Sequence, residues 1–330
     1  MHVAVIGVGR IGVLHAGILA ATDGIERVTV TDIDADLAAA VAAEHGFETA
    51  PDLDHAIHAA DAVVITAATS AHADLIVAST RAGKPTFCEK PISLDLESTG
   101  DIVDHVRSCG VVVQMGFQRR FDAGYTAARQ LVTSGGLGTL YVVRMAGHDP
   151  APPHEAYIPA SGGLFRDFSV HDFDALRFVT GQEIVEVYAD GAVLEFPIFE
   201  KYGDIDTGVA ILTLESGARG ILSVTRHDPL GYDIRMELFG SKDSVVVGWD
   251  DRMPLRSLEP GGVAAPSDPY PNFQERFRKA YERELAAFVE VARGERENPC
   301  TVEDAREALR VAVACDISRR EHRPVRVAEA

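Results

Sequence analysis

Short apolar segments alternate with amphipathic ones along the first 120 residues of the chain. The apolar segments have the length of strands and are rich in Val and Ile, which is typical of strands buried on both faces. They span 2–8, 27–32, 62–68, 85–89 and 111–116. The amphipathic segments have helical periodicity and span 10–22, 34–45, 72–83 and 95–109. This alternation predicts a parallel α/β sheet with helices on both faces over residues 1–120.

The pattern changes after about residue 120. A helix at 121–134, a strand at 140–147 and a helix at 166–179 are separated by a Pro-rich segment. Longer alternating segments follow, and they predict the strands of an antiparallel sheet. These span 183–193, 207–215, 218–227, 233–239 and 243–249, and helices at 272–293 and 302–320 and a short strand at 324–327 follow them. We therefore expect a second, α+β domain over 121–330, with a large, mostly antiparallel sheet.

The second face of the predicted antiparallel sheet must be either covered or solvated, and the strands carry alternating apolar positions. They include Ile211, Leu212, Leu214, Ile221 and Leu222. An apolar sheet face without a covering layer is typical of a subunit interface, so we expect a homo-oligomer.

A glycine-rich motif follows the first predicted strand directly and begins the first predicted helix. Its residues are Gly7, Val8, Gly9, Arg10, Ile11 and Gly12. In this context the first glycine allows a tight turn, the second a close approach of the backbone to a pyrophosphate, and the third close helix–strand packing. The free N–H groups at the helix N-terminus favour the phosphate charge. We predict a doubly wound Rossmann domain with Gly7, Gly9, Arg10, Ile11 and Gly12 at a dinucleotide.

Asp32 ends the second predicted strand, about 20 residues beyond the last glycine, where an acid binds the adenosine ribose hydroxyls. A carboxylate there repels a 2′-phosphate, and the next residue, Ile33, is not basic. The motif therefore favours NAD, although Arg10 leaves NADP open. The alternative for Asp32 is a simple helix cap.

Further candidates lie at the carboxyl ends of predicted parallel strands, where open α/β sheets bind ligands. Lys90, in the sequence Glu89-Lys90-Pro91, is placed to donate a proton or to stabilise an alkoxide, unless it is an ordinary surface lysine. The remaining candidates for cofactor binding are Thr66, Ala67, Thr69, His72, Glu89 and Gln118.

Asp167 and His171 are four residues apart in a predicted helix, which places them on one face. A carboxylate that orients an imidazole prepares it to accept a hydroxyl proton. Two alternatives remain for this segment. Asp167 is either a helix cap or, with Asp172 and Asp174, part of a solvated acidic face. A zinc site is the second alternative, with His148, His154 and His171 as ligands, but no HxxxH or CxxC motif supports it, and we expect no metal.

Composition narrows the function further. The chain has 330 residues, 46% of them hydrophobic, which is enough for two domains. The net charge of −19 argues against nucleic-acid binding. No apolar run approaches the roughly 20 residues of a membrane span, and the N-terminus lacks a signal-peptide pattern. The four cysteines show no CxxC spacing, so we expect reduced thiols and a cytoplasmic protein.

Four motifs in order resemble the Gfo/Idh/MocA oxidoreductase family over nearly the full chain. They are GVGRIG at the N-terminus, EKP around Lys90, GFQRRFD at 116–122, and the double glycine followed by Asp167 and His171. The segment 148–181 especially resembles the inositol 2-dehydrogenase branch, apart from His148 and Pro159-Ala160. The resemblance implies a catalytic set of Lys90, Asp167 and His171, an NAD-dependent oxidation of a secondary alcohol on a cyclitol or sugar, and dimers or tetramers. Further substrate contacts are expected at Arg119, His148, Asp149 and Tyr157.

Three other functions remain open within this resemblance. The substrate is an aminocyclitol or amino sugar if Asp149, Glu155 or Asp172 meets an ammonium group. Some family members are NAD-dependent glycoside hydrolases, which show no net formation of NADH. A non-catalytic NAD-dependent sensor is the last alternative, but it predicts loss of the Lys90, Asp167 and His171 set, which is present here.

Overall fold

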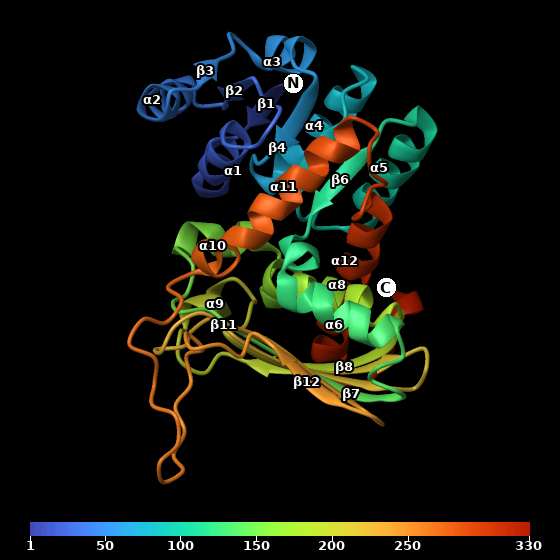
Figure 1. Ribbon diagram of the computed structural model, residues 1–330. Coiled ribbons are helices and arrows are strands. Elements are labelled where there is room, and N and C mark those ends of the chain that lie inside the picture. The colour runs from blue at the N-terminus through green and yellow to red at the C-terminus, as the bar shows by residue number, and fades with distance from the viewer. The chain divides into compact units, whose positions relative to one another are not determined.

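The computed structural model describes all residues from Met1 to Ala330 and divides into two compact units (Figure 1). The first unit consists of Met1–Phe121 and Lys279–Glu307, and the second of Asp122–Arg278 and Ala308–Ala330. The sequence predicted a division near residue 120 but assigned 279–307 to the second domain. Helix α11 (Arg278–Ala292) belongs to the first unit because its aromatic side chains pack there. Phe288 lies against Phe87, with 5.7 Å between the ring centroids.

The first unit contains a six-stranded sheet in the order β3-β2-β1-β4-β5-β6, in which every pair is parallel. Its strands are β1 (His2–Ile6), β2 (Arg27–Thr31), β3 (Glu48–Thr49), β4 (Ala62–Ile65), β5 (Thr86–Glu89) and β6 (Val113–Gly116). The inner strands are buried along most of their length, as their Val-rich composition predicts. The strand order reverses between β1 and β4, and the carboxyl ends of strands at such a point form the ligand site of doubly wound folds.

Helices connect the strands of this sheet. They are α1 (Arg10–Ala20), α2 (Ala35–His45), α3 (Leu53–Ala59), α4 (Thr69–Arg81) and α5 (Leu96–Cys109). Aspartates cap three of them: Asp34, Asp52 and Asp95 accept hydrogen bonds from backbone N–H groups of the first turns. These side chains satisfy donors that a helix start otherwise leaves unpaired. The sequence predicted the four longer helices but neither α3 nor the two-residue strand β3.

The second unit contains a seven-stranded sheet in the order β12-β11-β7-β10-β9-β8-β13. Its strands are β7 (Leu140–His148), β8 (Ile184–Ala192), β9 (Thr207–Leu214), β10 (Arg219–Thr225), β11 (Asp233–Gly240), β12 (Ser244–Val247) and β13 (Val325–Arg326). All neighbours are antiparallel except β7 and β10. Because this pair is parallel, both strands end at the same edge of the sheet, where His148 lies opposite Thr225.

Helices α6 (Ala123–Thr133) and α8 (Val170–Thr180) lie on one face of this sheet (Figure 1). Leu212, Leu214 and Leu222 are buried, so they do not belong to the exposed face on which the sequence placed them. Side chains alternate between the two faces of a strand, and Ile211 and Ile221 therefore point the other way. These two isoleucines are 53% and 43% exposed.

The α-helix expected at 166–179 begins only at Val170. A π-helical turn, η3 (Phe165–Ser169), precedes α8. The other short elements are η1 (Gln118–Phe121), η2 (Glu155–Tyr157), α7 (Ile158–Ser161), α9 (Ile198–Lys201), α10 (Phe273–Arg276) and η4 (Val327–Glu329). Helix α12 (Val302–Glu321) ends the helical part of the chain. None of the helices has both the length and the apolar composition that crossing a membrane requires.

Candidate functional site

The glycine motif forms a tightly packed loop between β1 and α1. The N–H of Gly7 donates to the carbonyl oxygen of Thr31 at 2.8 Å, and Gly7 has a φ of +96°. A Cβ on Gly7 would lie 2.4 Å from the backbone nitrogen of Ala67, and one on Gly12 would lie 2.0 Å from the oxygen of Gly7. Both positions therefore require glycine. A Cβ on Gly9 would meet no atom within 4 Å, so the loop is open on that side.

The N-terminus of α1 fits the pyrophosphate of a dinucleotide. Gly9 occupies the cap position, no side chain caps the helix, and the first turn contains no acidic residue. No acidic side chain in the first turn neutralises the partial positive charge of this helix end, so the helix end can bind the anionic group of a ligand. Arg10 is exposed in the first turn, Ile11 is half-buried and Gly12 is buried.

Asp32 is tied to this loop. One of its carboxylate oxygens accepts a hydrogen bond from the N–H of Val8 at 2.8 Å, and the other accepts from the N–H of Asp34 at 3.0 Å. Asp34, and not Asp32, is the cap of α2. Helix capping therefore does not account for Asp32, and its half-buried carboxylate remains a candidate for the ribose hydroxyls.

Two of the predicted cofactor residues serve the protein's own backbone. The hydroxyl of Thr66 donates to the carbonyl oxygen of Gly7 at 2.6 Å. The ring nitrogens of buried His72 lie 2.7 Å and 2.9 Å from the carbonyl oxygens of Pro91 and Ala67. Burial lowers the pKa of His72 from its usual value, although these carbonyl oxygens act in the opposite direction. The side chains of Thr66 and His72 thus hold neighbouring loops in place. Ala67 and Thr69 are half-buried in the segment from the end of β4 to the first residue of α4.

Lys90 lies directly after β5, where it is half-buried, and its peptide bond to Pro91 is cis. The preceding side chain, Glu89, pairs with the imidazole of His15, with 2.8 Å between Oε1 and Nε2. Gln118 and Arg119, which the sequence placed at the cofactor and the substrate, are both buried in η1 after β6.

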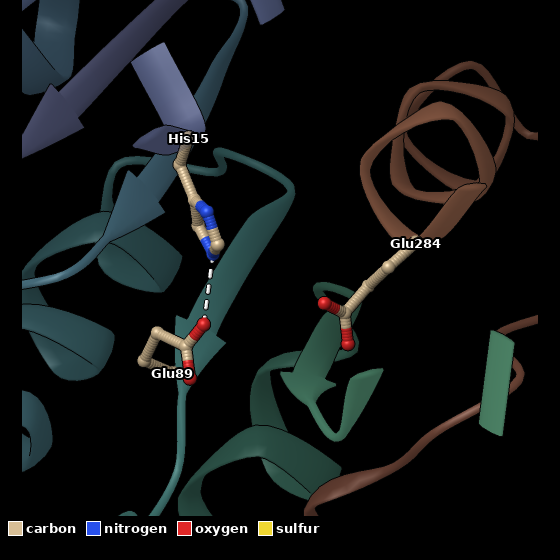
Figure 2. Close-up of side chains that lie close together, drawn as sticks. All are labelled: His15, Glu89 and Glu284. Carbon is tan, nitrogen blue, oxygen red and sulfur yellow. Dashed lines mark hydrogen bonds and ion pairs between the residues drawn. The ribbon is translucent and has the colours of Figure 1, made fainter. Parts of the chain in front are cut away.

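Buried His15, half-buried Glu89 and buried Glu284 lie close together in the first unit (Figure 2). One potential ligand atom from each lies within 4.8 Å of the others, so this group could hold a metal ion. His148, His154 and His171, the ligands of the zinc alternative, form no such group. The ring of His15 also packs against Phe87 and Tyr281, at centroid distances of 5.5 Å and 5.4 Å. The hydrogen bond between His15 of α1 and Glu89 of β5, together with the packing of the His15 ring, gives these two residues a structural role.

In the second unit, both carboxylate oxygens of Asp167 accept hydrogen bonds. The hydroxyl of Tyr157 donates to Oδ1 at 2.8 Å, and Nη1 of Arg226 donates to Oδ2 at 2.9 Å. The N–H of Asp167 donates to the oxygen of Gly163, so Asp167 lies inside a helical turn and is not a cap. The carboxylate of Asp167 is therefore fixed by Tyr157 and Arg226, and it does not cap the N-terminus of a helix.

Arg226 directly follows β10 and is 2% exposed. Its Nη1 also lies 3.6 Å from a carboxylate oxygen of Asp149, which follows β7. Burial opposes the charged form of the guanidinium, but Asp167, Asp149 and Asp204 raise its pKa above the usual value. The sequence did not single out Arg226, because the residue belongs to no recognisable motif and only the parallel pairing of β7 and β10 brings it to this edge.

His148 has a defined tautomer at the end of β7. Its Nδ1 lies 2.8 Å from the hydroxyl oxygen of Thr225, and this hydroxyl donates its own proton to the carbonyl of His227. The Nδ1 of His148 is therefore the donor, which leaves the lone pair on Nε2. Burial lowers the pKa of His148, which favours the neutral form of the ring, although nearby Asp233 and Asp228 act in the opposite direction. A neutral Nε2 can accept a hydrogen bond from a ligand hydroxyl.

His171 is half-buried in the first turn of α8, directly after the π-helical turn that contains Asp167. Phe168 of this turn lies against β7, and a Cβ on Gly147 would be only 2.4 Å from its ring. The absence of a side chain at Gly147 thus lets the turn approach the sheet. Asp172 and Asp174 are 1% and 0% exposed, so the interpretation of this segment as a solvated acidic face is wrong.

Two of the acids considered for an ammonium group already have cationic neighbours. Glu155 pairs with Lys201 at 2.7 Å and accepts a hydrogen bond from the hydroxyl of Tyr202 at 3.0 Å. Lys201 holds the pKa of Glu155 below its usual value. Asp149 lies beside Arg226, as described above.

Two family models match the chain. Residues 1–117 match the NAD-binding Rossmann fold of an oxidoreductase family, and residues 125–246 match the GFO/IDH/MocA C-terminal domain. The first unit is accordingly an NAD-binding Rossmann domain. The second carries the mostly antiparallel sheet.

Similarity to known proteins extends over the whole chain. A myo-inositol 2-dehydrogenase of Thermotoga maritima is 34% identical over 100% of this chain and 99% of its own. A scyllo-inositol 2-dehydrogenase (NAD(+)) of Bacillus subtilis is 36% identical over 98% of this chain and 95% of its own. The structure of scyllo-inositol dehydrogenase from Lactobacillus casei with NAD(H) and scyllo-inositol superposes with a TM-score of 0.88 at 31% identity, covering 99% of both chains.

Proposed function

Because this chain belongs to the Gfo/Idh/MocA oxidoreductase family, we propose that it is an NAD-dependent dehydrogenase that oxidises a secondary alcohol of a cyclitol. The observation that carries the proposal is the fixed carboxylate of Asp167, held by Tyr157 and Arg226 immediately before the helix of His171. A fixed carboxylate followed one helical turn later by an imidazole supports acid–base chemistry on a hydroxyl group.

In this reaction the alcohol carbon loses a hydride and its hydroxyl group loses a proton. His171 accepts the hydroxyl proton, and the carboxylate of Asp167 stabilises the imidazolium that forms. Lys90 donates a hydrogen bond to the reacting oxygen, where negative charge develops. NAD, when bound, supplies the hydride acceptor at C4 of its nicotinamide. Asp32 and the glycine loop bind the adenosine half of the cofactor.

A neutral, hydroxyl-rich substrate fits the surroundings of Asp167 better than an aminated one. An ammonium group needs an accessible carboxylate that has no other cation. Asp149 and Glu155 lie beside Arg226 and Lys201, and Asp172 is only 1% exposed. The neutral Nε2 of His148, in contrast, is an acceptor suited to a hydroxyl group. The relatives named as myo-inositol and scyllo-inositol dehydrogenases support the same class of substrate.

The open face of the second sheet supports a homodimer or homotetramer. Tyr188, Ile211 and Ile221 are cross-strand neighbours in β8, β9 and β10, and each is exposed by at least 39%. Burying such a row removes apolar surface from water at about 25 cal/mol per Å². Sedimentation at micromolar concentration is expected to show an oligomer, and charged residues at Ile211 and Ile221 are expected to dissociate it.

The test is a screen of purified protein with NAD or NADP and a panel of inositols, sugars and amino sugars. Accumulation of reduced nicotinamide with an inositol and NAD is the expected result. Turnover of an aryl glycoside without net reduced nicotinamide would instead identify a glycoside hydrolase. Absence of any turnover while NAD binds would favour a sensor.

A further inference from the structure

The buried guanidinium of Arg226 has a single hydrogen-bonded acceptor on its side chain. That acceptor is Oδ2 of Asp167, at 2.9 Å from Nη1. The Nε and Nη2 atoms of Arg226 are buried and hydrogen-bond to no other group. The side chain is only 2% exposed, and its nearest charged neighbours are the carboxylates of Asp167 and Asp149.

Burial of an unpaired charge is costly, whereas a guanidinium stays charged at every physiological pH. Arg226 is therefore a permanent cation beside Asp167, and it favours the ionised form of that carboxylate. The hydrogen bond from Tyr157 to Oδ1 fixes the other oxygen. The two contacts together determine both the charge and the orientation of Asp167.

The position of Arg226 is set by the sheet and not by the helix that carries Asp167. The backbone N–H of Arg226 donates to the carbonyl of Asp206 at 2.8 Å, and the N–H of Asp149 donates to that of Thr225 at 3.0 Å. These bonds anchor the ends of β10 and β7 to each other and to the start of β9. A rigid sheet edge is a more precise support for a functional side chain than a loop.

We propose that Arg226 is a positioning residue for proton transfer: it holds Asp167 as an oriented carboxylate and acts on His171 only through Asp167. This inference rests on the proposed dehydrogenase function. The loss of Arg226 would leave the glycine loop and Asp32 unchanged but would free the carboxylate of Asp167 that supports the base. Arg226 differs in this way from a residue that merely stabilises the fold.

The experiment compares Arg226→Gln and Arg226→Lys with Arg177→Gln. Arg177 is a matched control, since it is a largely buried arginine of the same unit that forms a bidentate pair with Glu183 at 2.7 Å. We expect Arg226→Gln to lower kcat by about 10- to 100-fold, by analogy with the loss of a side chain that orients a metal ligand. The KM for inositol and the Kd for NAD should change by less than about twofold. Arg226→Lys should restore part of kcat, and Arg177→Gln should keep the kcat of the parent.

A double-mutant cycle with Asp167→Asn tests whether Arg226 acts through Asp167. If it does, adding Arg226→Gln to Asp167→Asn leaves the residual kcat unchanged, because residues that act as a unit are not additive. Independent, multiplying losses would overturn the proposal, as would a kcat for Arg226→Gln equal to that of the parent. The same four proteins are also compared by melting temperature. If the parent oxidises no cyclitol, the proposed function fails. The melting temperatures still test the coupling of Arg226 to Asp167 in that case. Additive shifts would refute the coupling, and non-additive shifts would support it.

Discussion

The carboxylate of Asp32 accepts a hydrogen bond from the backbone N–H of Val8 at 2.8 Å, which joins the end of β2 to the glycine loop. A carboxylate is thereby fixed beside the loop that we propose as the site of the cofactor pyrophosphate. Hydroxyl groups can donate to such a carboxylate, whereas a phosphate in the same place is repelled by it. The structural relationship therefore bears directly on the choice between NAD and NADP.

Asp32→Asn should weaken the preference for NAD over NADP. The amide oxygen can still accept from the N–H of Val8, but the like charge that repels the 2′-phosphate is gone. Repulsion of this kind costs several kcal/mol, so the ratio of kcat/KM for the two cofactors should fall by at least about tenfold. Asp36→Asn, in the exposed first turn of α2, is the control. An unchanged ratio in Asp32→Asn would show that Asp32 does not select the cofactor.

Gly9→Ala and Gly12→Ala should fail in different ways. A Cβ on Gly12 meets the oxygen of Gly7 at 2.0 Å, so Gly12→Ala should lower stability by about 1–3 kcal/mol or more. A Cβ on Gly9 meets no atom within 4 Å, so Gly9→Ala should melt like the parent but bind NAD more weakly. Thermal melts and NAD titrations of both variants separate the two effects. Normal NAD affinity in Gly9→Ala would argue against the pyrophosphate lying at this loop.

His171→Ala should lower turnover by about 100-fold or more, the typical contribution of a general base, while NAD affinity stays unchanged. His154→Ala is the matched control, because His154 is exposed and accepts a hydrogen bond only from a nearby backbone N–H. Initial rates and NAD titrations provide the measurement. A loss of turnover in His154→Ala equal to that in His171→Ala would contradict the acid–base assignment of His171.

The stabilising effect of His72 should depend on pH. Burial lowers its pKa below the usual 6.5, so the unfolded chain takes up a proton before the folded one does. The contribution of His72 is then complete above about pH 6.5 and declines as the pH falls toward the folded-state pKa. The difference in free energy of unfolding between the parent and His72→Asn should accordingly be largest near neutral pH and shrink in acid. Urea denaturation at several pH values measures it, and a difference that grows in acid would contradict the assignment.

The parts of the fold that were predicted correctly are those whose structure depends on residues close together in the sequence. The buried parallel strands, the long helices and the glycine loop follow from apolar periodicity and from a motif with steric requirements at Gly7 and Gly12. Strand β3 and helix α3 were missed because they are two and seven residues long, too short to show a period. Leu212 and Leu222 were misplaced because a local pattern does not say which face of a sheet the helices cover.

The contacts around the candidate site depend on topology, which the sequence does not state. Arg226 reaches Asp167 only because β10 pairs in parallel with β7, an exception in a sheet expected to be antiparallel. Glu284 joins His15 and Glu89 only because α11 belongs to the first unit. Resemblance to a family indicated Lys90, Asp167 and His171, but it gave no information about the neighbours that hold them.

The most direct test of the proposed reaction follows the hydrogen that leaves the substrate. Purified protein is incubated with NAD and an inositol that carries deuterium on every ring carbon, and the reduced nicotinamide is analysed by NMR. The account predicts deuterium at C4 of the nicotinamide together with one equivalent of the ring ketone. Ring oxidation without label on the nicotinamide, or no reduced nicotinamide with any inositol, would contradict it.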